Sequence, residues 1–455
     1  MQAKVHPMEY SGGSYMKYPV SIVPYQAPVE SVERAVMLCG GLNHMPAKAK
    51  VFIKPNIVFW TRACTFPKWG VITTSRVIED LVVLLKKHGI DDITIGEGVV
   101  ADPKDNETPA HAFETLGYNR LGRRYGVKSV NVMQRPFVKV DLGDGMHLKL
   151  NQDIMDSDFV IDLPVMKTHN QTVVSLGIKN LKGTIDINSR KKCHSADPEK
   201  DLHFHIARLA DRMPPILTLI DGIYTLERGP AFDGKMHRRN LLAASPDILS
   251  ADLVGTRLLG HKPEDVPYLV HAAANRGRPT DLSDIEIKGD SIDTWAAYHE
   301  HDFAYVSDES KELPKPLAKQ GITGLFYRKF DGTMCTYCSG LNGLILSAVR
   351  YAWKGEPWDN VEVLTGKAMQ PSPGMQATVL LGQCMYKKNK DHPNIRKMIP
   401  VKGCPPQPKD VVDALHEAGI EVDPKLFDQI EMLPGLFMER YKDRPEFEES
   451  FFRVQ

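Results

Sequence analysis

The chain lacks several features that would assign it to a common class. Its 57 basic and 57 acidic side chains leave no formal net charge over 455 residues. Nucleic acids and anionic lipid surfaces select for an excess of Lys and Arg, so we expect neither as the main partner. No stretch reaches the ~18 uninterrupted apolar residues that a membrane-spanning helix needs.

The first twenty residues also lack the pattern of a secretion signal, because no apolar core stands between basic and small residues. Cysteine is scarce and odd in number, with seven residues, whereas a disulfide framework needs pairs. We therefore expect a cytoplasmic protein whose thiols stay reduced. A disulfide is the weakest interpretation of any cysteine pair.

What the sequence does contain is a repeated strand and helix pattern. "VFIKPNIV" (51–58) is a short apolar run, typical of a strand buried on both faces, and Pro55 predicts its end near Lys54. Ser75 is expected to cap a helix that stops at Gly89, and "DITIG" (92–96) is the next strand. This order implies parallel pairing with a right-handed crossover.

The pattern recurs to about residue 260, so the predicted fold class is α/β, with an open, mostly parallel sheet and helices on both faces. We expect an N-terminal arm (1–30), the α/β domain (31–289) and a linker (290–325) rich in proline and lysine. A smaller, cysteine-rich domain with a helical tail follows (326–455).

Polar side chains follow several of the predicted strands, where open sheets bind ligands. Their grouping favours binding of a small anion, with His169 as acid or base near neutral pH and a lysine among other cations as base or nucleophile. We predict catalytic roles for Lys167, His169 and Lys179, and substrate-binding roles for Lys54, Asn56, Glu97 and Asn180. The alternative is that the lysines are solvated and His169 is a satisfied loop residue. Asp221 and Asp252 are expected to be structural at least as often as catalytic.

Four cysteines stand late in the chain, each beside turn-forming residues. Cys335 and Cys338 form C-x-x-C, and Cys384 and Cys404 follow singly. Four thiolates on flexible turns favour a [4Fe–4S] cluster, whereas four-cysteine zinc sites usually come as two close pairs. Zinc or unligated thiols remain the alternatives.

The other candidate ligands are expected to be structural. Cys39, Cys64 and Cys193 have no cysteine near them in the sequence. His203 and His205 are two positions apart and would face different directions on a helix.

The stretch "FVIDLPVMKTHNQTVVSLGIKNLKGTI" (159–185) resembles the family called domain of unknown function 362, in which a strand precedes Lys-Thr-His and Gly-x-Lys-Asn-x-x-Gly. "IKPNIV", "ITIGEG", "LIDGIYTLERGP" and "SPDILSADLVGTRLLG" are similar to other landmarks of that family. The resemblance covers roughly residues 50–262. It implies no established reaction, although members are often associated with iron–sulfur centres.

Two further resemblances are local or distant. "GCPPQP" followed by a predicted helix resembles the cluster-binding segment of the small electron-transfer subunit of complex I and hydrogenases, without its adjacent cysteine pair. The nickel-dependent lactate racemase family has a similar α/β domain, in which His and Lys side chains meet a nucleotide-like cofactor. His169 and Lys179 would be the nearest counterparts, but "LGIKN" lacks the glycine pair that precedes the lysine there.

These observations give three functional hypotheses. The first is a [4Fe–4S] enzyme, a redox or cluster-assisted one, acting on a small carboxylate-type anion under anaerobic conditions with a redox partner protein. The second is a non-catalytic iron–sulfur protein for electron transfer or cluster maturation. The third is an isomerase with a nucleotide-like cofactor, similar to lactate racemase.

Overall fold

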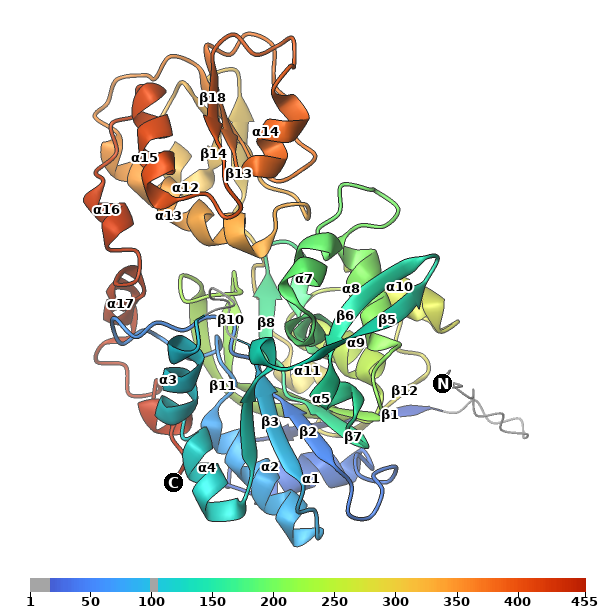
Figure 1. Cartoon of the computed structure of the whole chain (residues 1–455). Helices are drawn as coiled ribbons and strands as arrows, with labels where there is room; N and C mark the ends of the chain where they lie inside the picture. Colours follow the sequence, from blue (N-terminus) through green and yellow to red (C-terminus); the bar gives the residue numbers. More distant parts are fainter. Residues whose placement is uncertain (1–16, 99–104) are drawn as a thin grey trace.

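Two sheets, one after the other along the chain, organise the computed structural model, which describes residues 17–98 and 105–455 (Figure 1). The first sheet has ten strands in the order β12-β1-β11-β10-β7-β2-β3-β4, with β8 paired to β10 and β9 paired to β8. Its strands are β1 (Tyr18–Pro24), β2 (Val51–Lys54), β3 (Ile93–Glu97), β4 (Lys128–Asn131), β7 (Phe159–Asp162), β8 (Val165–His169), β9 (Val173–Ser175), β10 (Ile216–Glu227), β11 (Lys235–Ser245) and β12 (Ile285–Gly289). The run from β10 through β7, β2 and β3 to β4 is parallel.

Helices cover both faces of this sheet, which confirms the predicted α/β class. One face packs against α1 (Glu30–Leu38), α2 (Ser75–Lys87), α3 (Glu107–Thr115) and α4 (Tyr118–Tyr125). The other packs against α8 (Leu202–Ala210), α9 (Ile248–Leu258) and α10 (Pro267–Asn275). Strands such as β2 and β7 are buried along their whole length, as their apolar runs predict.

A separate two-stranded hairpin and several short helices complete the first part. The hairpin pairs β5 (Phe137–Gly143) with β6 (Met146–Asn151) and precedes α5 (Gln152–Met155). The short helices α6 (Gly177–Asn180), α7 (Ile187–Cys193) and α11 (Ile292–Trp295) follow in chain order. Among the described residues, no helix is both long and apolar enough to cross a membrane.

The second sheet has six strands in sequence order and is parallel except for its first pair. Its strands are β13 (Tyr305–Asp308), β14 (Lys311–Pro314), β15 (Leu325–Tyr327), β16 (Val361–Leu364), β17 (Ala377–Leu381) and β18 (Met398–Val401). Its helices are α12 (Lys315–Ala318), α13 (Thr336–Ala352), α14 (Gln383–Asn389) and α15 (Pro408–Glu417). The cysteine-rich segment is therefore a second α/β unit with its own core.

The structure differs from the predicted domain boundaries at both ends of the first part. Residues 1–16 of the predicted arm (1–30) lie outside the described residues, and the rest of it contains β1. This strand lies between β11 and β12 because its apolar residues Val20 and Ile22 are buried in the core. The predicted linker (290–325) contains β13 and β14, which form the edge of the second sheet. Its prolines are compatible with this structure because Pro314 ends a strand and Pro316 lies in the first turn of α12.

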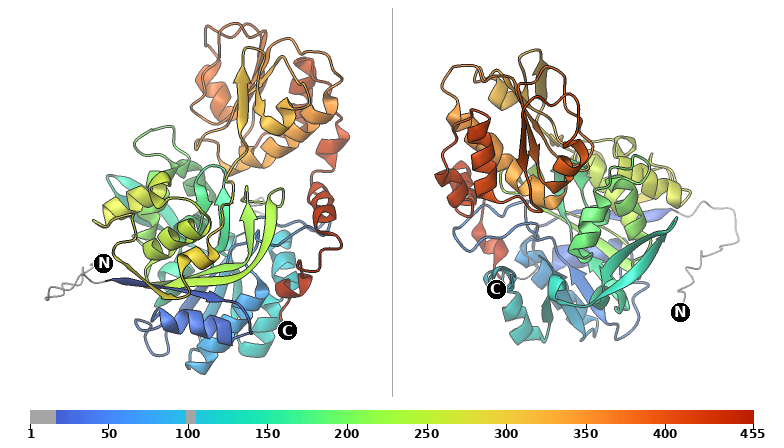
Figure 2. Two further views of the ribbon diagram at one scale, coloured as in Figure 1. Left: turned by 180° about the vertical axis from the view of Figure 1, so that it is seen from behind. Right: turned by 45° about the horizontal axis from the view of Figure 1, so that its top comes forward.

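The C-terminal tail also differs from its predicted place in the cysteine-rich domain. After α16 (Lys425–Asp428) and α17 (Leu433–Leu436) the chain runs back down to the first sheet, as the red segment in Figure 2 shows. Tyr441, Phe447 and Phe452 are buried there in the core that α2 covers, and Phe447 contacts Trp69. The tail therefore ties the second unit to the first.

Candidate functional site

Three neighbouring parallel strands of the first sheet end in charged side chains that are almost completely buried. Lys54, Glu97 and Asp162 are the last residues of β2, β3 and β7. The Lys54 Nζ atom lies 2.5 Å from Glu97 Oε2. The Glu97 carboxylate also accepts hydrogen bonds from the backbone N–H groups of Ile57 and Gly98, at 3.1 and 2.8 Å. The charge of Lys54 is thus compensated inside the protein.

Asparagine side chains connect this ion pair to its neighbours. Asn180 donates to Asp162 Oδ1 at 2.7 Å, and its Oδ1 accepts from Asn56 Nδ2 at 2.8 Å. Asn56 Oδ1 in turn accepts from Lys167 Nζ at 2.6 Å. The structure therefore brings the four predicted substrate-binding residues together, but their polar groups bind one another.

Burial in this network shifts two ionisable groups. Burial raises the pKa of Asp162 well above its usual range, and the nearby carboxylates of Asp252 and Glu97 add to the effect. Burial also lowers the pKa of Lys167 to about 7. Asp162 Oδ2 has no hydrogen-bond partner among the described residues.

The two glycines of Gly-x-Lys-Asn-x-x-Gly are required by close packing against this network. A Cβ atom on Gly183 would lie 2.8 Å from Lys54 Nζ and 3.0 Å from Glu97 Oε1. A Cβ atom on Gly177 would lie 2.8 Å from Asp162 Oδ2. The motif therefore reflects the absence of space beside buried charges.

Asp252 and Asp221 have structural roles. Asp252 accepts from the backbone N–H groups of Gly177 and Ile178 at 2.7 and 3.0 Å, and burial raises its pKa to about 7. Asp221 accepts from the Thr74 N–H at 2.7 Å, next to the start of α2. Both carboxylates fix turns that carry other polar side chains.

His169 and Lys179 form a pair beside this network. His169 Nδ1 accepts a hydrogen bond from the Gln171 N–H at 3.0 Å, so a neutral ring carries its proton on Nε2. Nε2 lies 3.4 Å from Lys179 Nζ. Burial lowers the pKa of both groups, and Lys182 and Lys167 lower that of Lys179 further by charge repulsion. Both are therefore biased toward their neutral forms.

Lys182 and His194 form a second pair, and His194 was not among the predicted site residues. His194 Nδ1 donates to the Gly332 carbonyl at 2.7 Å, so its Nε2 can accept from Lys182 Nζ, also at 2.7 Å. Burial lowers the pKa of Lys182 to about 8. Arg190, also not predicted, is buried in the same region and donates to the Gly183 carbonyl at 2.7 Å. We call Lys167, His169, Lys179, Lys182, Arg190 and His194 the cationic edge.

The four late cysteines lie at the carboxyl ends of strands in the second sheet. Cys335 and Cys338 stand at the start of α13, which follows β15. Cys384 lies in the first turn of α14 directly after β17, and Cys404 lies between β18 and α15. Cys335 is buried and Cys338 partly exposed, whereas Cys384 and Cys404 are exposed.

The four thiols influence one another electrostatically. A hydrogen bond from the Cys338 thiol, together with backbone N–H groups at the start of α13, lowers the pKa of Cys335 to about 5. That hydrogen bond raises the pKa of Cys338, which burial and the charges of Cys335, Cys384 and Cys404 raise further. Within residues 17–98 and 105–455 no three His, Cys, Asp or Glu side chains are placed to hold a single metal ion.

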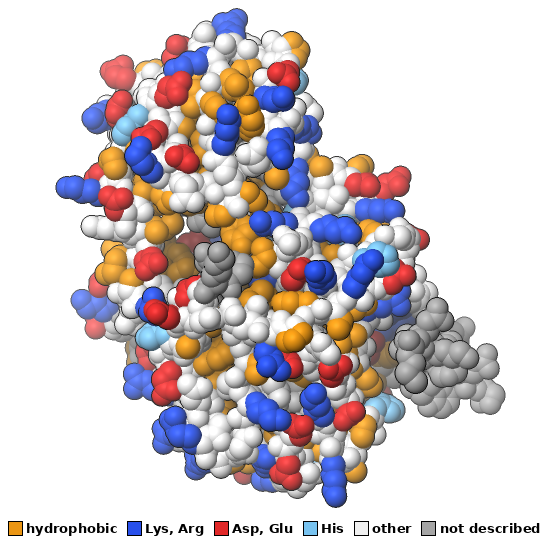
Figure 3. All heavy atoms as spheres, in the orientation of Figure 1, with side chains coloured by type: hydrophobic (Ala, Val, Ile, Leu, Met, Phe, Trp, Pro, Cys, Tyr) orange, Lys and Arg blue, Asp and Glu red, His pale blue; other side chains and the backbone are white. Residues whose placement is uncertain are grey.

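The cationic edge and the thiols meet at the boundary between the two units. Gln171 Nε2 donates to the Met334 carbonyl at 2.9 Å, and Lys367 Nζ donates to the Lys191 carbonyl at 2.9 Å. The charge of Cys335 acts on Lys182 across this boundary. Lys and Arg side chains, blue in Figure 3, gather over the region of α7 beside the second unit.

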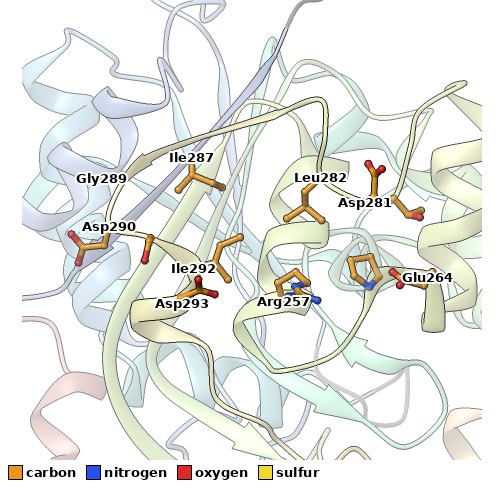
Figure 4. A pocket seen from close by; sticks show the side chains of 12 residues that line it. Arg257, Glu264, Asp281, Leu282, Ile287, Gly289, Asp290, Ile292 and Asp293 are labelled. Atoms are coloured by element: carbon orange, nitrogen blue, oxygen red, sulfur yellow. The ribbon is translucent and has the colours of Figure 1, made fainter.

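A surface pocket of about 630 Å³ lies elsewhere, between α9, β12 and α11 (Figure 4). Arg257 faces a rim that is mostly acidic, with Glu264, Asp281, Asp290 and Asp293. The predicted site residues do not line it.

The remaining predictions on cysteine and histidine concern residues other than the cationic edge and the four late cysteines. Cys39 and Cys193 are buried, and burial raises the pKa of each to about 11. Cys64 is partly exposed, with its Sγ 3.5 Å from the Glu431 carbonyl oxygen. His205 Nδ1 lies 2.7 Å from the Asp201 carbonyl oxygen of its own helix.

Comparison with known proteins gives the following relatives. The protein named "Thylakoid-associated protein sll1697" of Synechocystis sp. is 27% identical over 233 residues, which cover 50% of this chain and 69% of that protein. A solved structure from Thermotoga maritima shares 13% identity and a TM-score of 0.32, over 56% of this chain and 60% of its own. The lactate racemase apoprotein from Thermoanaerobacterium thermosaccharolyticum shares 13% identity and a TM-score of 0.33, over 54% of this chain and 57% of its own. The chain thus spans less than two thirds of either solved structure.

A family model matches the part of the chain that carries the cationic edge. The family is described as Domain of unknown function (DUF362), and the match covers residues 51–257, from β2 to α9. It includes both motif glycines and every member of the cationic edge. Over this segment, the chain is similar to the DUF362 family.

Proposed function

We propose that Cys335, Cys338, Cys384 and Cys404 bind a [4Fe–4S] cluster, and that the protein is a redox or cluster-assisted enzyme acting on a small carboxylate-type anion. The observation that supports this most is the meeting of two carboxyl edges. The first sheet contributes cations and the second contributes thiols, and His194 of the cationic edge donates to the Gly332 carbonyl of the second unit at 2.7 Å. Open α/β sheets bind ligands at these edges.

The donor set fits an iron–sulfur cluster. Four cysteines from three strand–helix junctions lie near one another, and thiolates are the ligands such clusters use. The N-terminus of the long helix α13 at Cys335 favours negative charge. Zinc, the alternative, would need all four sulfurs at ~2.3 Å from one ion. Once bound, the cluster would supply electrons, or a Lewis-acidic iron if one cysteine did not ligate it.

The residues of the first unit would bind the anion and move a proton. Lys182 and Arg190 attract a carboxylate to the boundary. The neutral His169 ring can donate a hydrogen bond from Nε2–H, and a neutral Lys179 Nζ can accept a proton. Lys54 and Glu97 contact Asn180 and the turn at Gly183. They therefore help to position the neighbouring Lys179 without contacting the anion.

Cluster content tests the metal part of the proposal. Protein isolated without oxygen should contain about four irons and four sulfides per chain. Cys384→Ser should lose most of this iron, whereas Cys64→Ser, which changes another accessible cysteine, should keep it. Equal iron in the two variants would contradict the proposed ligand set.

A non-catalytic electron carrier is the second candidate, and the exposure of Cys384 and Cys404 favours it. The electron paramagnetic resonance spectrum of the reduced protein separates the two. An enzyme should show a changed spectrum with acetate, succinate or citrate, and Lys179→Gln should weaken that response. A spectrum indifferent to all three would favour the carrier.

A further inference from the structure

A second pocket, lined by none of the cationic-edge residues or late cysteines, has a volume of about 530 Å³. It lies between β1, the start of α2, β11 and the C-terminal tail. The lining residues are Tyr25, Gln26, Pro28, Arg76, Arg238, Asn240, Glu448, Ser450, Phe451 and Gln455. This volume falls within the range of small-molecule sites.

Arg76 is the unusual member of this lining. Only 7% of the residue is exposed, and no hydrogen bond or ion pair joins its guanidinium to any residue in the described ranges. Asp80, one turn further along α2, acts on it only at longer range, and the Asp80 carboxylate accepts the Tyr25 hydroxyl at 2.6 Å. An arginine that lines a pocket without a protein partner is available to pair with an anionic ligand.

The rest of the lining is rich in donors and has aromatic walls. Arg238 is already engaged by Asn240 Oδ1, Tyr224 and Glu448 and stacks on Phe451, so it shapes the pocket. The side-chain amides of Gln26 and Asn240 add donors beside Arg76. Tyr25 and Phe451 meet edge to face, with ring centroids 6.2 Å apart.

We infer that this pocket binds a small organic anion through a carboxylate or phosphate group paired with Arg76. A planar oxyanion can accept two parallel hydrogen bonds from a guanidinium, and the aromatic walls suit an apolar remainder. The site is independent of the proposed function because it shares no residue with the cationic edge or the four thiols.

The position of the pocket couples the ligand to the C-terminal tail. Glu448, Ser450, Phe451 and Gln455 belong to the tail, whereas Arg76 belongs to α2. A bound anion therefore contacts both and should hold the tail against the first sheet. Ligand binding should also raise the melting temperature.

Calorimetric titration of the full chain with inorganic phosphate, and separately with citrate, tests this site. At least one probe should bind saturably with Kd below about 1 mM. Arg76→Gln should weaken that binding at least tenfold, whereas Arg123→Gln, at an exposed arginine of α4, should not. Lys179→Gln should leave the Arg76-dependent part of that binding intact, which separates this site from the proposed active site. A response to phosphate alone or to citrate alone identifies the group that is recognised.

Thermal unfolding provides a second readout that does not depend on calorimetry. Without added anion, Arg76→Met should melt at or above the temperature of the unchanged protein, because it removes an unpaired buried charge. The same variant should lose the rise in melting temperature that the binding probe causes. Absence of saturable binding by both probes, or equal binding by Arg76→Gln, would overturn the inference.

Discussion

The polar groups at the carboxyl ends of the strands have different kinds of partner in the two sheets. At the first sheet, Lys54, Glu97, Asn180 and Asp162 are bonded to one another. At the second sheet, the four thiols have mainly one another as partners, and two of them are exposed. The polar groups of the first edge therefore mostly bind one another, whereas we propose that the thiols of the second edge bind a ligand.

The largest effect should come from breaking the ion pair of the first edge. Lys54→Met leaves Glu97 buried without its cation and should cost about 3–5 kcal/mol of the free energy of unfolding. Adding Glu97→Gln should recover part of this loss, because no net charge then remains buried. Urea unfolding of both variants measures the difference.

The second unit supplies the matched control for that prediction. Lys409 and Asp413 form an ion pair on α15 with both side chains exposed. Lys409→Ala should leave the unfolding curve unchanged. If Lys54→Met also left the free energy of unfolding unchanged, the ion pair of Lys54 and Glu97 would not stabilise the first edge.

Removing the tail's anchor should come next in size. Phe447→Ala deletes a ring that is 8% exposed and contacts Trp69, Tyr224 and Tyr441. We expect a loss of about 3 kcal/mol from the first unit, with little change in the second. Amide hydrogen exchange resolves the two units, and equal loss of protection in both would contradict this division.

The first edge should also depend on pH through Lys167. The pKa of Lys167 is about 7 in the folded protein, below its ordinary value of 10.5, so the unfolded chain binds the proton more tightly. Protonation of the buried Lys167 therefore lowers the free energy of unfolding. This loss is fully present below pH 7 and decreases as pH rises toward 10.5. Relative to Lys167→Met, the unchanged protein should gain about 2–3 kcal/mol between pH 7 and pH 9. A constant difference would contradict the lowered pKa.

The smallest effects should come from glycine-to-alanine substitutions, one in each unit. Gly183→Ala places a methyl group against Lys54 and Glu97 and should cost about 1–3 kcal/mol. Gly343→Ala lies within α13, where nothing is within 4 Å of the new Cβ atom. It should therefore stabilise the protein by about 0.5–1 kcal/mol. Effects of the same sign in thermal unfolding would remove the contrast between the two units.

The sequence predicted the first edge well because local rules apply there. Pro55 marks the end of β2 at Lys54, and the strand–helix alternation places Glu97 and Asp162 at the same edge. The predicted polar residues do meet, but their mutual bonding depends on the Asn180 turn. Sequence spacing does not show which of these polar groups form hydrogen bonds with one another.

Other parts could not be read from local patterns. Strands such as β15, with three residues, are too short to be recognised among cysteine loops, so the second sheet was missed. His194 is oriented toward Lys182 by a hydrogen bond that it donates to the Gly332 carbonyl, 138 positions away. The tail was assigned to the wrong unit because the alternation of its aromatic residues does not say which core they enter.

An anomalous scattering map at the iron edge, from crystals of protein prepared without oxygen, would locate any bound iron. We expect one compact iron peak per chain, enclosed by Cys335, Cys338, Cys384 and Cys404 and facing Lys182 across the boundary. Iron bound elsewhere, or these four sulfur atoms without iron between them in iron-replete protein, would contradict this expectation.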